Sequence, residues 1–62
     1  MKKKPKYKVG EHAVVTTKDD DRSWVEVHQI LKVINEENEQ EVSYETAIGI
    51  YPESRIEGVV SV

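Results

Sequence analysis

The stretch GIYPESRIEGVV, residues 49–60, places a proline and a serine between two apolar pairs. Pro52 cannot donate a backbone hydrogen bond to a central strand ladder, so it marks an edge or a turn. Its fixed backbone angle suits residues 52–55 to a single tight 3₁₀ turn. Residues 56–62 are then predicted to form a short closing strand. The apolar residues expected to hold the two flanks of this turn in the core are Ile50 and Ile56.

Two further strands are predicted upstream of this turn. Residues 12–18 are rich in Val and Thr, which favours a strand with Ala13 and Val15 facing inward. Residues 24–34 follow a polar, acidic loop at 19–23 and alternate with a period of two. Such a strand would extend about 36 Å, so we expect it to bend and serve two sheets. Its two predicted faces are an inner face of Val25, Val27, Leu31 and Val33, and an outer face of Trp24, Glu26, His28, Ile30, Lys32 and Ile34.

The next segment is predicted to be a loop at 35–40 followed by a strand over about 40–48. A helix over 35–47 competes with this interpretation, because Glu and Gln are good helix formers. The alternation of the segment favours the strand instead. The residues expected to share its one face are Val42, Tyr44, Thr46 and Ile48.

Four or five short strands, with one 3₁₀ turn before the last, predict an all-β small barrel, whose closure removes exposed sheet edges. GIYPESRI resembles the end of Src-homology-3-type domains, and KYKVGEHAVV resembles the start of many bacterial and phage barrels of this class. The resemblance covers most of residues 7–60 and implies a Src-homology-3-like barrel, similar to small barrel proteins of Firmicutes and their phages. The chain lacks the Ala-Leu-Tyr-Asp-Tyr segment and the Trp pair of the peptide-binding members. Only Tyr51 and Pro52 match their polyproline groove, so the resemblance implies a fold rather than a ligand.

Length and charge divide the chain into an arm and a body. The 62 residues make one domain, predicted over 7–62, after a flexible basic arm at 1–6. The first eight residues hold five lysines and no acid, whereas the rest carry a formal charge of −8 within a net charge of −3. No apolar run approaches a membrane span and no secretory signal is present, so we expect a cytoplasmic protein.

No pattern in the sequence indicates catalysis. The chain has no cysteine, its serines lack a nucleophile-elbow setting, and His12 and His28 lie on different predicted strands. Three adjacent aspartates at 19–21 lack the spacing of a calcium loop. We therefore expect a non-enzymatic protein with no cofactor and no metal site.

The favoured function is a small protein-interaction or regulatory module, or an inhibitor, whose acidic surface meets a basic surface on a protein partner. The predicted partner-binding residues are Asp19, Asp20, Asp21, Trp24, Glu37, Glu39 and Tyr51, and the wider acidic surface adds Glu36, Glu41 and Glu45. The alternative is nucleic-acid binding by the arm and exposed aromatics, since lysines pair with phosphates and Tyr7 can stack a base. Its residues are Lys2, Lys3, Lys4, Lys6, Tyr7 and Lys8. A third hypothesis is that the chain is a structural or oligomerising element whose short strands pair between copies. We expect the protein to be a monomer or a weak homo-oligomer.

Overall fold

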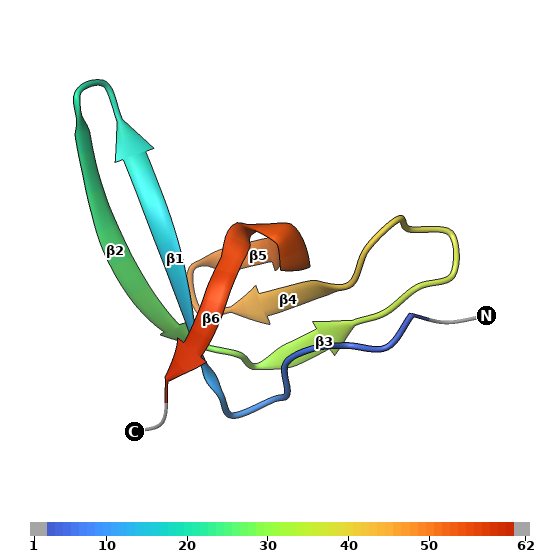
Figure 1. The fold of residues 1–62 in the computed structure, drawn as a ribbon. Coiled ribbons are helices and arrows are strands. Elements are labelled where there is room, and N and C mark those ends of the chain that lie inside the picture. Colours follow the sequence, from blue (N-terminus) through green and yellow to red (C-terminus); the bar gives the residue numbers. More distant parts are fainter. Residues whose placement is uncertain (1–2, 61–62) are drawn as a thin grey trace.

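The computed structural model describes residues 3–60, and within them the chain is all-β apart from one 3₁₀ turn. Two three-stranded antiparallel sheets, with strand orders β2-β1-β6 and β3-β4-β5, make up the fold (Figure 1). No strand pairing between residues 3–60 joins the two sheets into a closed barrel. The elements are β1 (His12–Asp19), β2 (Arg22–Gln29), β3 (Lys32–Ile34), β4 (Ser43–Thr46), β5 (Gly49–Pro52), η1 (Glu53–Arg55) and β6 (Ile56–Val60).

The predicted strand over 24–34 is divided between the two sheets, which confirms that this segment bends and serves both. Ile30 exchanges backbone hydrogen bonds with the segment before β1, donating to Glu11 O at 2.8 Å and accepting from Gly10 N at 2.9 Å. The next residue, Leu31, donates to Glu45 O of β4 at 2.8 Å. The chain therefore passes from one sheet to the other between two successive residues.

The predicted inner and outer faces of this segment are wrong for β2. Val25 and Val27 are 61% and 47% exposed, whereas Ile30 is completely buried. The pairing with β1 explains this, because Val15 lies opposite Glu26, which puts Glu26 on the core side of the sheet. The β1–β2 hairpin extends away from the rest of the molecule (Figure 1), so its outer valines have nothing packed over them.

The core lies where the two sheets meet. Its centre is the fully buried Tyr44 of β4, which alternates with buried Val42 and Thr46 as predicted. Ala13 and Val15 also face inward as predicted. Among residues 3–60, one buried cluster comprises Ala13, Ile30, Val42, Tyr44 and Ile56, with Tyr7, Val33, Tyr51 and Val59 packed against it.

Two isoleucines expected in the core are exposed. The strand predicted over 40–48 ends at Thr46, and a tight turn at residues 47–48 leads into β5, so Ile48 is 56% exposed. The Thr46 hydroxyl stabilises this turn by donating to Gly49 O at 2.9 Å. Ile50 pairs with Glu45, on the face of β4 opposite to buried Tyr44, and is therefore 58% exposed; of the two predicted flanking residues, Ile56 is the one that is buried.

The turns agree with the sequence-based predictions better than the buried and exposed faces of the strands do. Pro52 precedes the predicted 3₁₀ turn, and the Ile56 N–H closes it on Glu53 O. The segment between β3 and β4 contains no helix, as predicted. The predicted loop at 19–23 shortens to a two-residue turn, in which Asp20 adopts a positive φ of 52°. Asp tolerates this left-handed conformation better than most residues.

Candidate binding site

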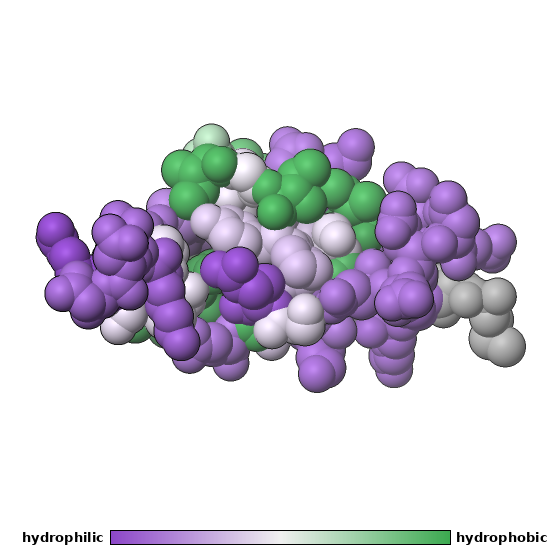
Figure 2. All heavy atoms as spheres, turned by 90° about the horizontal axis from the view of Figure 1, so that it is seen from above, coloured by the Kyte–Doolittle hydropathy of each residue, from purple (hydrophilic) through white to green (hydrophobic). Residues whose placement is uncertain are grey.

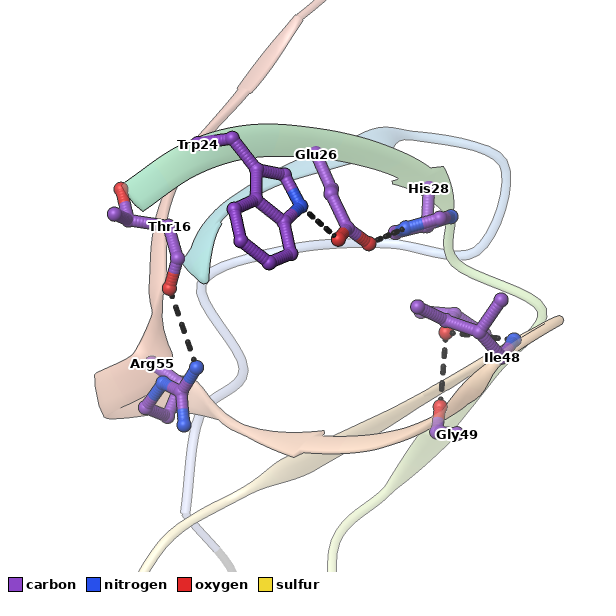
Figure 3. A network of polar contacts seen from close by, with 8 residues as sticks. Thr16, Trp24, Glu26, His28, Ile48, Gly49 and Arg55 are labelled. Atoms are coloured by element: carbon purple, nitrogen blue, oxygen red, sulfur yellow. Dashed lines mark hydrogen bonds and ion pairs between the residues drawn. The ribbon is translucent and has the colours of Figure 1, made fainter. Parts of the chain in front are cut away.

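Three side chains form a row on the inner side of β2. Figure 3 shows Trp24, Glu26 and His28 pointing the same way, across from Ile48 of the β4–β5 turn. The indole Nε1 of Trp24 donates to Glu26 Oε2 at 2.5 Å, and His28 Nε2 bonds Glu26 Oε1 at 2.8 Å. Each oxygen of the Glu26 carboxylate is thus hydrogen-bonded to one aromatic ring, Oε2 to the Trp24 indole and Oε1 to the His28 imidazole. Trp24 remains 41% exposed although its polar atom is satisfied, so it presents an oriented aromatic surface to solvent.

Hydrogen bonding lowers the pKa of Glu26 below its ordinary value of 4.5, first through His28 and then through Trp24. A carboxylate with a lowered pKa stabilises the fold above its unfolded pKa, and this contribution is lost as the pH falls through the folded value. The Glu26 carboxylate is therefore ionised at neutral pH, and its contribution to the row is lost in acid.

Acid titration of the single tryptophan tests this network. Protonation of Glu26 alters its hydrogen bond to the Trp24 indole. We therefore expect the Trp24 fluorescence to change with a midpoint below pH 4.5, the ordinary pKa of a glutamate. Glu26→Gln removes this step, whereas Glu37→Gln in the exposed β3–β4 loop retains it. A midpoint at or above 4.5 in the unmodified chain would contradict the arrangement.

Across from this row lies the positively charged Arg55, the last residue of the 3₁₀ turn η1. Its guanidinium donates to Thr16 O at 3.3 Å and lies 5.9 Å from the centre of the Tyr51 ring. The Thr16 hydroxyl in turn donates to Glu57 of β6. An open polar groove lies at Arg55, and the residues that line it are Thr16, Thr17, Lys18, Ser54, Arg55 and Glu57.

The predicted acidic residues lie at two ends of the molecule. Asp19–Asp21 are exposed at the tip of the β1–β2 hairpin, and Glu37 and Glu39 are exposed in the β3–β4 loop (Figure 1). The longest dimension of the molecule is 40 Å. Trp24 is on the same hairpin as the three aspartates, whereas the loop glutamates lie at the other end of the molecule. Tyr51 is half-buried against the core on the side of Arg55.

The residues of the nucleic-acid alternative are partly engaged within the chain. The Tyr7 ring packs edge-on against Tyr44, with 5.5 Å between centroids, and its N–H points to the Tyr44 hydroxyl at 3.4 Å. Lys3 contacts the β3–β4 loop, whereas the side chains of Lys4, Lys6 and Lys8 are exposed. Lys2 lies outside the described residues, and the flexibility of residues 1–6 stays a prediction.

Sequence reasoning found Trp24 but missed its setting. It placed Glu26 and His28 on one face of residues 24–34 without a binding role, placed Ile48 on the face of Tyr44, and gave Arg55 no role beyond the predicted turn. The i, i+2 spacing of Trp24, Glu26 and His28 was the available signal, since residues two apart share a strand face. The described residues contain no group of three or more His, Cys, Asp or Glu that could hold a metal ion.

Apolar and polar surfaces are segregated along the molecule. The face in Figure 2 has apolar side chains near its middle, while hydrophilic side chains cover both ends.

Within residues 3–60, no helix has the length and apolar character needed to cross a membrane. Comparison with known proteins found no matching family model, no matching curated protein and no matching solved structure.

Proposed function

We propose that this chain is a non-enzymatic protein-interaction or regulatory module that binds a basic segment of a protein partner along the inner side of the β1–β2 hairpin. The observation that carries the proposal is the row on β2, where the Glu26 carboxylate holds Trp24 half-exposed on the same hairpin whose turn carries the three aspartates. Oriented aromatics surrounded by polar groups are typical anchors of binding surfaces. The carboxylates at the tip would attract the basic segment and set its direction.

We also propose that the fold is a variant of the Src-homology-3-like barrel. The supporting features are the three-stranded meander β3-β4-β5, the 3₁₀ turn after it, and a last strand that returns to pair with β1. The proposal concerns architecture alone. The binding surface follows from Trp24 and its neighbours and not from the fold.

The exposed aromatic and the aspartates make separate contributions that substitutions can distinguish. We expect Trp24→Ala to weaken binding of a lysine-rich peptide at least tenfold, since a central aromatic anchor contributes about 2 kcal/mol or more. Val25→Ala is the matched control. Val25 is the next residue, but its side chain lies on the side of β2 opposite to Trp24 and is 61% exposed. Isothermal titration calorimetry measures both.

Salt dependence tests the electrostatic half of the proposal. Attraction between exposed charges weakens as the Debye length falls from about 30 Å at 0.01 M to about 8 Å at 0.15 M. Affinity for the basic peptide should therefore fall steeply over this range. Changing Asp19, Asp20 and Asp21 together to Ser should remove most of that dependence. Unchanged affinity and salt dependence in the triple variant would overturn the role of the turn.

A further inference from the structure

The basic arm contacts the acidic end of the molecule that the proposed site does not use. The Lys3 ammonium donates to Glu36 O at 2.8 Å and to Glu39 O at 2.5 Å, both in the β3–β4 loop. Asn35 of the same loop donates through Nδ2 to Lys3 O at 2.5 Å. The loop therefore binds both the side chain and the backbone of one lysine.

Two further contacts fix the course of the arm. The Lys6 N–H donates to Glu53 Oε2 at 3.2 Å, and the same carboxylate oxygen accepts from the Tyr44 hydroxyl at 2.6 Å. Tyr7 then packs on Tyr44. The arm is thus attached at Tyr7 to the core and at Lys3 to the loop, with its intervening residues exposed.

The charges of this contact are complementary. Lys3 contacts a loop that carries glutamates at 36, 37 and 39, and further lysines follow it at positions 4 and 6 of the arm. The carbonyls that bind Lys3 come from two of these acidic residues. This is the arrangement expected of an acidic loop with a basic peptide bound to it, except that the peptide belongs to the same chain.

We infer that residues 3–6 act as an intramolecular masking segment, which occupies a second site for basic peptides on the β3–β4 loop. The tether keeps the arm at a high effective concentration near the loop, so a lysine-rich segment of a partner must displace it. The inference goes beyond the proposed function, since it concerns the loop and not the hairpin. It shares with the proposed function only the basic character of the partner.

One unsatisfied atom favours displacement by a suitable peptide. Asn35 Oδ1 is buried and has no hydrogen-bond partner within residues 3–60. A peptide that accepts from Nδ2 and also donates an N–H to Oδ1 makes a bond that the arm does not make. An Asn side chain can form both bonds with one extended backbone.

The test uses the full chain and the chain's own first six residues, MKKKPK, as a separate peptide. Lys3→Ala weakens the mask, because it removes both ammonium bonds and retains the backbone contacts of the arm. Lys4→Ala is the matched control, with the same loss of charge from an exposed side chain that makes no polar contact within residues 3–60. Amide chemical shifts of residues 35–39 report peptide binding at low ionic strength.

We expect the peptide to bind the Lys3→Ala chain about tenfold more tightly than the unmodified chain or the Lys4→Ala chain, since two charge-assisted bonds no longer compete. The shifts should concentrate in residues 35–39. Equal affinity of the Lys3→Ala and Lys4→Ala chains, or shifts confined to the hairpin, would overturn the inference. Shifts confined to the hairpin would support the proposed function while overturning this inference, so failure of the inference can be distinguished from failure of the proposed function.

Discussion

Replacement of Ile30 by alanine is expected to unfold a large fraction of the molecules. Ile30 is completely buried at the point where the chain passes between the sheets, and truncation of such a residue costs about 2–5 kcal/mol. A domain of this size has a total unfolding free energy of roughly 3–9 kcal/mol, by the usual value per residue. The loss is therefore comparable to the whole stability of the fold. Urea denaturation followed by circular dichroism measures it.

Val25→Ala is the control for this prediction, because it is 61% exposed on the same segment. Its cost should be within about 0.5 kcal/mol, as for most surface substitutions. Comparing the loss of stability in the two variants shows which face of residues 24–34 is buried. The structure buries the face of Ile30, whereas the sequence analysis predicted that the face of Val25 is buried. A greater loss of stability at Val25 than at Ile30 would show that the segment is packed the other way round.

Loss of stability at alkaline pH is the second large effect. The Tyr44 side chain is buried and donates to Glu53 Oε2 at 2.6 Å, and burial followed by this bond raises its pKa to about 12. The fold requires the neutral phenol, whereas the unfolded chain loses the proton near pH 10. The stabilisation is therefore fully present below pH 10 and declines as the pH rises towards 12. Unfolding free energies measured between pH 8 and 12 should show this decline.

Tyr44→Phe should remove most of this alkaline dependence. At neutral pH it should also cost about 1–3 kcal/mol, because Glu53 loses one of its two donors and the Tyr7 N–H loses its acceptor. Tyr51→Phe is the control, since its hydroxyl makes no hydrogen bond within residues 3–60 and Tyr44 is retained. A Tyr44→Phe chain with the same alkaline decline as the unmodified chain would assign that decline to another group.

The sequence predicted where the strands and the 3₁₀ turn lie better than it predicted which face of each strand is buried. The strands near 12–18 and 43–46, the 3₁₀ turn after Pro52 and the inward Ala13 and Val15 follow from local propensity and alternation. Alternation divides residues 24–34 into two sets but does not say which set is buried. That choice depends on the pairing with β1 and on how far the hairpin extends beyond the core.

The same limit explains the errors at Ile48 and Ile50. Both continue an apolar pattern, but the tight turn after Thr46 starts a new strand and removes them from the core. A two-residue turn between polar and apolar residues gives little local signal. The burial of Ile56 was predictable, because the fixed angle of Pro52 sets where the last strand begins.

For the candidate site, single residues were predictable but their partners were not. Trp24 and the aspartates stand out by type and position. The bonds from Glu26 to two aromatic rings depend on side-chain direction, which sequence spacing only permits. The contact between Lys3 and the β3–β4 loop joins residues more than thirty positions apart, and no local pattern indicates it.

The most direct test of the proposed function follows Trp24 fluorescence while the full chain is titrated with decalysine at 10 and 150 mM salt, with a duplex DNA oligonucleotide as the second ligand. The proposed site predicts a saturable change with decalysine that weakens strongly at the higher salt, and no change with DNA. The Val25→Ala chain should behave like the unmodified chain. An emission that does not respond to decalysine at 10 mM salt, or that responds to DNA instead, would contradict the proposal that the inner side of the β1–β2 hairpin binds a basic partner.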